Sequence, residues 1–157
     1  MNFTIYTDGG CSGNKRDAGC KGAWAGVILD PGNQGIASFK GFEENTTNNR
    51  MELSAVFKGL KYAKEVADNN YGGSKLIDCI IITDSMYVVN NYEDYVDEWK
   101  KNGWRKSGGG SVINFDIWKM ICSMTPEFKS VKFQWVKGHS TNKFNQQADA
   151  LVRSLLY

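Results

Sequence analysis

The sequence feature that most constrains the fold is a nearly unbroken apolar run, LIDCIII, at residues 76–82. A short run rich in β-branched residues is typical of a central strand that is covered on both faces. It follows residues 51–67, where apolar side chains recur at helical spacing until Asn and Gly pairs interrupt the pattern. The helix therefore serves as a crossover, and we expect the buried strand to lie parallel to the first strand of the chain.

The flanking segments complete the predicted architecture. Strand-like stretches at 3–7, 24–29 and 36–42 are separated by Gly-rich or Pro-Gly turns, which predicts an antiparallel meander. Hydrophobic patterns predict the remaining elements, namely a short helix after Ser85, a helix over 113–124, a strand over 131–135 and a helix from about Asn145. The expected fold class is α/β, with a five-stranded mixed sheet of three antiparallel and then two parallel strands, flanked by helices.

Length and composition limit the classes of protein. A chain of 157 residues is the size of one domain, and we expect residues 1–157 to form a single unit. The apolar runs are too short to span a bilayer and the amino terminus lacks a secretory signal, so we expect a cytoplasmic protein with no membrane partner. No obligate protein partner is implied. The four cysteines lie far apart without a Cys-x-x-Cys pair, and we expect reduced thiols at Cys11, Cys20, Cys79 and Cys122.

Acidic residues follow two strands of the predicted sheet. Asp8 comes where the first strand ends, directly before Gly9-Gly10, and Asp84 comes where the buried strand ends. Ligands of open α/β sheets bind outside the carboxyl ends of the strands, so these two carboxylates should be neighbours at a reaction centre. Taken singly, each Asp could equally belong to a turn or cap a helix.

Two further carboxylates lie beside the apolar stripes of predicted helices. Glu52 precedes Leu53 and Asp149 follows Ala148, so both side chains project beside the core. The simpler interpretation of each is a solvated acid near the start of a helix, where the helix dipole favours negative charge. Convergence of several carboxylates at one edge of the sheet would change that interpretation.

A cluster of four carboxylates would require cations. Each close pair repels by about 4 kcal/mol at ~4 Å in an effective dielectric near 20. Oxygen ligands without clustered His or Cys select Mg²⁺, or Mn²⁺ as a substitute, over zinc. Two such ions would bridge a phosphodiester, one activating water and the other stabilising the leaving oxygen. The acidic residues therefore indicate metal-assisted phosphodiester hydrolysis.

A basic segment that carries aromatic side chains follows the predicted short helix. Its members are Trp99, Lys100, Lys101, Trp104, Arg105 and Lys106. Lysine and arginine beside aromatic rings are typical of surfaces that follow a nucleic-acid backbone. Because acidic residues precede the segment, a solvated helix end of mixed charge is the alternative interpretation.

Six segments, in this order, resemble type 1 ribonucleases H. They are TDGGCSGN at 7–14, TTNNRMEL at 46–53, TDS at 83–85, WKKNGW at 99–104, VKGHS at 136–140 and AD at 148–149. A lone Thr-Asp-Gly carries little information, but six ordered segments cover nearly the whole chain. The resemblance implies a ribonuclease H-like fold and internal cleavage of the RNA strand of RNA/DNA hybrids, which leaves 5′-phosphate and 3′-hydroxyl ends.

The resemblance also implies residue roles. Asp8, Glu52, Asp84 and Asp149 would bind two metal ions, and His139 would assist proton movement or product release from a polar loop. The 2′-hydroxyl groups would distinguish the RNA strand. The implied contacts with RNA are Cys11 and Asn14 at the sugars and Asn48, Asn49 and Met86 in the minor groove. Helix capping is the alternative role for the two neighbouring asparagines.

The DNA strand would meet a different set of residues. The implied contacts are Tyr95, Trp99, the basic segment Lys100 to Lys106, and a phosphate pocket of Thr47 and Asn114. Three positions depart from the common family pattern: Asn45 stands in place of Arg, Tyr95 in place of Trp, and Gln146 in place of an acid. We expect activity to survive these changes, whereas the affinity for the hybrid could be lower than in family members with the common residues.

Two alternatives share parts of this pattern. A related polynucleotidyl transferase, such as an integrase core, would have the same fold and metals, but such enzymes usually lack the TNNRME and GH segments in this order. A catalytically inactive module that binds hybrids would keep the basic segment and would be expected to have lost carboxylates. All four carboxylates are present in this chain.

Overall fold

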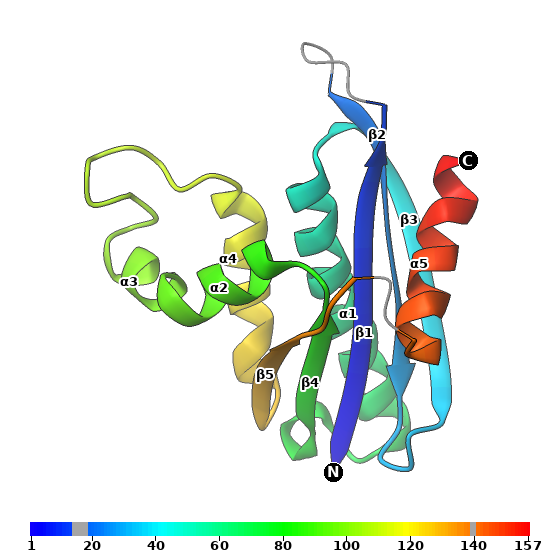
Figure 1. Ribbon diagram of the computed structural model, residues 1–157. Coiled ribbons are helices and arrows are strands. Elements are labelled where there is room, and N and C mark those ends of the chain that lie inside the picture. The colour runs from blue at the N-terminus through cyan, green and yellow to red at the C-terminus, as the bar shows by residue number, and fades with distance from the viewer. Residues whose placement is uncertain (14–18, 139–140) are drawn as a thin grey trace.

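A computed structural model of the chain describes residues 1–13, 19–138 and 141–157. Within these residues, five strands form one sheet in the order β3-β2-β1-β4-β5 (Figure 1). Their bounds are Asn2–Ser12 for β1, Cys20–Leu29 for β2, Gly35–Thr46 for β3, Asp78–Thr83 for β4 and Ser130–Trp135 for β5. Strands β1, β2 and β3 pair antiparallel, and β4 lies parallel to β1 and β5. The predicted α/β fold with a mixed sheet is confirmed.

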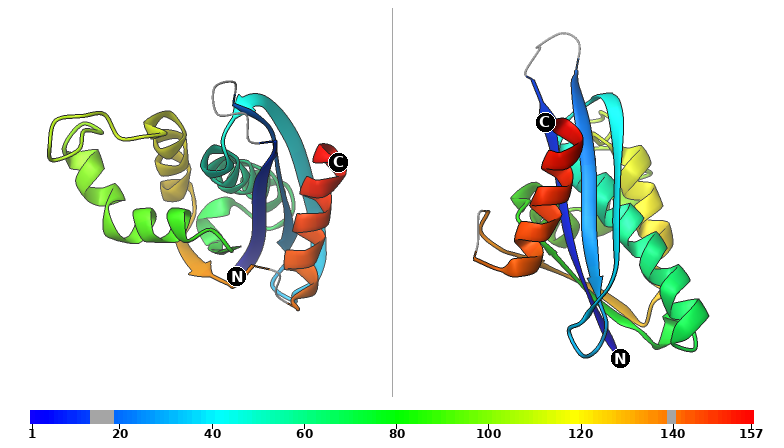
Figure 2. Two further views of the ribbon diagram at one scale, coloured as in Figure 1. Left: turned by 45° about the horizontal axis from the view of Figure 1, so that its top comes forward. Right: turned by 90° about the vertical axis from the view of Figure 1, so that its right-hand side faces the viewer.

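Helices cover both faces of the sheet (Figure 2). Helix α1, Asn48–Asn70, packs on one face, and α5, Lys143–Leu156, packs on the other. Helices α2 (Met86–Asp94) and α3 (Val96–Lys101) extend to the side away from α5, and α4 (Phe115–Met124) returns to pack against α1. We call residues 86–114, which comprise α2, α3 and the loop before α4, the basic limb.

The main core lies between the sheet and α1. Successive residues of a strand face opposite sides, so Phe3 and Ile5 of β1 are fully buried on the α1 side, against residues such as Leu60. On the other side, Tyr6 packs with Phe144 of α5 at a ring-centroid distance of 5.7 Å. Because both faces of β1 are buried, its backbone is held firmly in the part of the strand that leads to Asp8.

Strand β1 is longer than predicted. The sequence analysis placed a turn at Gly9-Gly10, but β1 continues to Ser12 and stays paired with β2 over that length. The two glycines are strand residues, and the missing side chain of Gly9 lets α1 approach. A Cβ on Gly9 would lie 2.3 Å from the carbonyl carbon of Met51 in α1, whereas a Cβ on Gly10 would lie 3.5 Å from Val152 in α5.

Other boundaries also differ from the predictions. Strand β4 begins at Asp78 because Ser74–Leu76 form a 3₁₀ turn, and α5 begins at Lys143 because the side chain of Asn142 caps it. Helix α3 was not predicted as a separate element. Its first turn is acidic and its last turn is basic, a distribution that suits the helix dipole. The mixed charge run is therefore partly a helix, as the alternative interpretation proposed.

The prediction of four reduced cysteines is wrong for two of them. Cys11 and Cys20 form a disulfide whose Cα atoms are 5.6 Å apart, whereas Cys79 and Cys122 are free. The sequence analysis considered spacing along the chain and did not consider the sheet register. Pairing of Ser12 with Lys21 brings the end of β1 beside the start of β2, which places the two cysteines within the usual Cα range of a disulfide.

Among the described residues, none of the helices is both long enough and apolar enough to cross a membrane.

Candidate active site

Strands β1 and β4 part where the acidic residues begin. Their parallel ladder ends at the pair Tyr6 and Ile82; Asp8 follows two residues later, and Asp84 is the first residue after β4. Because both strands run in the same direction, the two carboxylates emerge at one edge of the sheet. The prediction that Asp8 lies at the end of its strand is corrected: it lies where β1 leaves β4, while β1 itself continues beside β2.

Glu52 reaches the same place because α1 approaches β1 closely. A Cβ on Gly9 would lie 2.5 Å from the backbone nitrogen of Glu52, so only glycine permits this approach. The start of α1 is fixed by Thr47, whose Oγ1 accepts a hydrogen bond from the backbone N–H of Arg50 at 3.2 Å. The helix thus delivers its carboxylate to the edge where Asp8 and Asp84 emerge.

The structure brings three carboxylates together at this edge. One oxygen from each of Asp8, Glu52 and Asp84 lies within 4.8 Å of the others. Asp8 is 8% exposed and Glu52 is 9% exposed. Burial, followed by the charges of Asp84 and Asp149, raises the pKa of Asp8 to about 8. Burial and the charges of Asp8 and Asp84 also raise the pKa of Glu52 well above its usual value.

The fourth predicted carboxylate approaches from α5. Asp149 is half-buried and lines a cavity of about 310 Å³ together with Asp8 and Gly10. Its charge and a hydrogen bond to it contribute to the raised pKa of Asp8, which indicates direct proximity. Asp149 is outside the tightest group of three, so it borders the cluster from the opposite face of the sheet.

The cluster suits a hard divalent cation. Oε1 of Glu52 is buried and has no hydrogen-bond partner among the described residues. A buried carboxylate oxygen without a partner is costly, and mutual repulsion adds to that cost. Mg²⁺ and Mn²⁺ prefer carboxylate oxygens as ligands, so these residues fit such an ion.

Strand β5 and the loop after it support Asp84. The indole Nε1–H of Trp135 donates to the backbone carbonyl of Asp84 at 3.0 Å. A Cβ on Gly138 would lie 3.3 Å from Oδ2 of Asp84, so this loop passes close to the carboxylate. The sequence analysis missed Trp135, because an aromatic residue at the end of an alternating strand has the pattern of a core residue. His139 and Asn14 lie outside the described residues.

The predicted RNA contacts surround the acidic cluster. Cys11 and Asn48 line the same cavity as Asp8. Asn48 and Asn49 are exposed and begin α1, but Thr47 supplies the helix cap, so capping does not account for the two asparagines. Met86 follows the cluster directly in the chain and is 56% exposed at the start of α2.

The aromatic side chains of the basic limb form a platform. The rings of Tyr95 and Trp99 stack with centroids 5.7 Å apart and planes inclined by 17°. Both line a second cavity, of about 380 Å³, with Arg105 and Lys106. Lys100 and Lys101 are exposed nearby in the last turn of α3. Trp99 and Trp104 are both half-buried and also pack against the main core.

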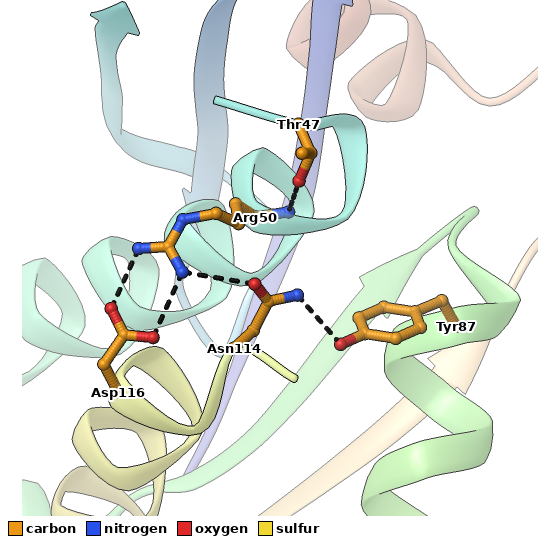
Figure 3. Close-up of polar contacts among 5 residues, drawn as sticks. All are labelled: Thr47, Arg50, Tyr87, Asn114 and Asp116. Atoms are coloured by element: carbon orange, nitrogen blue, oxygen red, sulfur yellow. Dashed lines mark hydrogen bonds and ion pairs between the residues drawn. The ribbon is translucent and has the colours of Figure 1, made fainter. Parts of the chain in front are cut away.

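The predicted phosphate pocket contains more residues than sequence analysis assigned. Thr47 caps α1, and Asn114 precedes α4; Arg50 lies between them, donating to Oδ1 of Asn114 at 3.1 Å (Figure 3). Tyr87 and Asp116 complete the network. The signal for Arg50 was present, since it falls within TNNRMEL, but its partners lie 64 and 66 residues away in the chain.

Comparisons with known proteins agree with this geometry. The RNase H family model matches residues 1–156. The ribonuclease H of Wolbachia pipientis wMel is 39% identical over 152 residues, which cover 97% of this chain and 93% of the relative. The ribonuclease H of Thermoanaerobacter sp. (strain X514) is 41% identical over 151 residues, which cover 94% of this chain and 85% of the relative.

Solved structures show the same arrangement. LC9-RNase H1, described as a type 1 RNase H with the type 2 active-site motif, has a TM-score of 0.77 and 28% identity, covering 98% of this chain and 71% of that chain. LC11-RNase H1 in complex with an RNA/DNA hybrid has a TM-score of 0.70 at 20% identity. The match covers 97% of this chain and 94% of that chain, and it supports the fold alone.

The strand order and the acidic edge define a ribonuclease H-like nuclease fold. The match over residues 1–156 and the identities of 39% and 41% show that the chain belongs to the ribonuclease H family and is an enzyme of that family.

Proposed function

We propose that the chain, as a single domain over residues 1–157, is an endonuclease that hydrolyses the RNA strand of RNA/DNA hybrids. Cleavage uses two Mg²⁺ ions, which Mn²⁺ can replace, and leaves 5′-phosphate and 3′-hydroxyl ends. The observation that carries this proposal is the convergence of Asp8, Glu52 and Asp84, each from a different element, on one edge of a ribonuclease H fold.

The four carboxylates would hold the ions. Bound Mg²⁺ supplies an activated water and stabilises the charge that develops on the phosphate. Asp8 takes the central position, because its pKa responds to both Asp84 and Asp149. Trp135 holds the backbone of Asp84 through the indole N–H, so this carboxylate leaves the strand in a fixed direction. Burial of Asp8 and Glu52 restricts water around their oxygens.

His139 would move a proton or assist product release. The basis is the resemblance of residues 136–140 to the family and the imidazole pKa, which lies near neutrality. Gly138 next to it passes within contact distance of Asp84, which brings the start of this loop to the acidic cluster.

The two strands of the hybrid would meet different chemistry. Cys11, Asn14, Asn48, Asn49 and Met86 would face the RNA and its 2′-hydroxyl groups. In the disulfide form Cys11 has no thiol hydrogen, so its contact would run through its backbone. By the same resemblance, the DNA strand would lie over the aromatic platform and the cations of the basic limb, with one phosphate in the pocket of Thr47 and Asn114.

A cytoplasmic location and the absence of an obligate protein partner belong to the same proposal. Bacterial relatives support the location.

A cleavage assay tests the function. A labelled RNA/DNA hybrid, the single-stranded RNA and the corresponding duplex DNA are incubated with the protein, with Mg²⁺ and with a chelator instead. We expect internal cuts in the RNA of the hybrid only, and only with the metal. Binding of the hybrid without cleavage would identify an inactive module, and transfer or joining of DNA strands would identify a polynucleotidyl transferase.

A further inference from the structure

Arg50 lies at the centre of a hydrogen-bonded chain that connects three helices (Figure 3). Its guanidinium donates to Oδ1 of Asn114 at 3.1 Å and to the two carboxylate oxygens of Asp116 at 3.1 and 2.9 Å. Nδ2 of Asn114 then donates to the hydroxyl of Tyr87 at 3.1 Å. The chain therefore runs from α1, through the start of α4, to α2.

The charge of Arg50 is matched inside the protein. Asp116 binds two guanidinium nitrogens in a bidentate pair, the geometry that suits this group best. The hydrogen bonds of this pair, and then the attraction between its opposite charges, raise the pKa of Arg50 and lower the pKa of Asp116. Three guanidinium hydrogen bonds are therefore directed at Asp116 and Asn114.

Asn114 adopts a backbone conformation that asparagine reaches only at a cost. Its φ is 63°, in the left-handed region, which costs a non-glycine residue on the order of 1 kcal/mol. It occupies the N-cap position of α4, yet its side chain makes no capping hydrogen bond, although asparagine is among the best capping residues. The side chain is instead engaged by Arg50 and Tyr87, as expected of a residue held in place for another purpose.

Arg50 determines which end of the Asn114 amide is the donor. The amide has one acceptor oxygen and one NH₂ group with two N–H bonds, and a guanidinium can only donate. The oxygen must therefore face Arg50, and the NH₂ group must face away from it. The hydroxyl of Tyr87 can donate or accept, so it does not fix the orientation. One N–H bonds to Tyr87 and the second is left for a ligand.

We propose that Arg50 is a positioning residue for recognition of the DNA strand: it orients the Asn114 amide so that an N–H is available to a DNA phosphate. This inference rests on the proposed function. In this chain Asn45 stands where the family commonly has Arg, so the pocket lacks that cation and depends more on the neutral donor Asn114. Without Arg50 the amide can turn over, and its oxygen then faces the anionic phosphate.

The experiment measures hybrid binding with cleavage blocked by the substitution Asp8→Asn in every variant. Affinity for a labelled RNA/DNA hybrid is determined over a series of salt concentrations for Arg50→Met, Arg50→Lys, Asn114→Ala and the double variant Arg50→Met with Asn114→Ala. We expect Arg50→Met and Asn114→Ala each to weaken binding about fivefold to tenfold, the size of one hydrogen bond. Lysine also only donates, so Arg50→Lys should restore most of the affinity.

Two readouts distinguish a positioning role of Arg50 from a direct contact with phosphate and from a purely structural role. If Arg50 acts through Asn114, the double variant binds no more weakly than either single variant, and the slope of log affinity against log salt stays unchanged in Arg50→Met. A direct phosphate contact would instead lower the slope by about one. Arg105→Gln, which removes a cation of the basic limb, serves as the comparator that should lower it.

Three results would overturn the inference: binding of Arg50→Met equal to that of the parent, additive losses in the double variant, or a reduced salt slope in Arg50→Met. Thermal unfolding of each variant shows whether it is folded. If Arg50→Met does not fold, the comparison of Arg50→Lys with Asn114→Ala still tests the inference. Cleavage of the hybrid by the unmodified chain is measured alongside. Absence of that cleavage would reject the proposed function, whereas normal cleavage with unaffected binding by Arg50→Met would reject only the role of Arg50.

Discussion

The acidic edge of the sheet and the basic limb have opposite constructions. The carboxylates of Asp8, Glu52 and Asp84 come from three elements, and two of them are buried among like charges. The limb carries its aromatic and basic side chains on neighbouring turns, and most of them are exposed, as with Tyr95 and Lys101. One region is assembled by tertiary structure against electrostatic repulsion; the other is encoded locally and faces solvent.

Because of this difference, we expect the two regions to respond differently to substitutions. Displacement of one carboxylate in the acidic edge should remove function altogether, because no neighbouring group can replace a buried ligand. A change in the basic limb should reduce affinity by increments, because many weak contacts share the binding. Four predictions test this contrast, in order of decreasing expected effect.

The substitution Asp8→Asn should have the largest effect on catalysis. It removes one of the three clustered carboxylates, and we expect kcat to fall by about a thousandfold, or ~4 kcal/mol in the barrier, while the fold and hybrid binding persist. Single-turnover cleavage of a hybrid, beside a binding measurement, checks this. An undiminished cleavage rate would refute the assignment of the acidic edge.

The substitution Gly9→Ala should have the largest effect on stability. Its Cβ would lie 2.3 Å from backbone carbon of Met51, so β1 and α1 must separate, with an expected loss of ~3 kcal/mol. The matched control is Gly10→Ala, whose Cβ would make an ordinary contact 3.5 Å from Val152. Urea unfolding of both variants measures the difference. Equal stabilities would show that the approach of α1 to β1 is not tight.

The metal-free protein should lose stability as the pH rises. Asp8 keeps its proton in the folded state up to a pKa of about 8, whereas the unfolded chain releases it near 3.8. Since the folded state binds more protons between these values, stability falls with rising pH, by up to ~1.4 kcal/mol per pH unit. Unfolding in chelator from about pH 5 to about pH 8 measures the slope.

The same unfolding experiment shows which residues cause the pH dependence of stability. Asp8→Asn should make the slope shallower, because the substituted side chain does not titrate, and Mg²⁺ should oppose the loss at high pH, because it binds the ionised carboxylates. A slope that is unaffected by both changes would assign the pH dependence to residues outside the acidic edge.

The substitution Tyr95→Ala should have the smallest of the four effects. It removes one ring of the stacked pair in the basic limb, and we expect KM for the hybrid to rise about tenfold, near the lower end of one base-stacking contact. The kcat should stay within about twofold, because Tyr95 lies away from the acidic edge. A fall in kcat as large as that in Asp8→Asn would remove the contrast between the two regions.

The sequence by itself determined the elements that depend on local pattern. The apolar run at 76–82 and the helical stripe before it predicted a central strand and a crossover, and therefore the mixed sheet. The resemblance also implied Tyr95 and Trp99 as contacts of the same strand, and the structure shows their rings stacked. Side-chain periodicity follows from backbone geometry alone, so no distant contact is needed to recognise it.

Only the tertiary structure decided what depends on register and close approach. The length of β1, the role of Gly9 against α1, the bond between Cys11 and Cys20 and the partners of Arg50 each join segments that sequence spacing does not relate. Such features arise when strands pair and helices pack, because the energy of each contact exists only once both segments are in place. For the same reason the burial that raises the pKa of Asp8 has no counterpart in the unfolded chain.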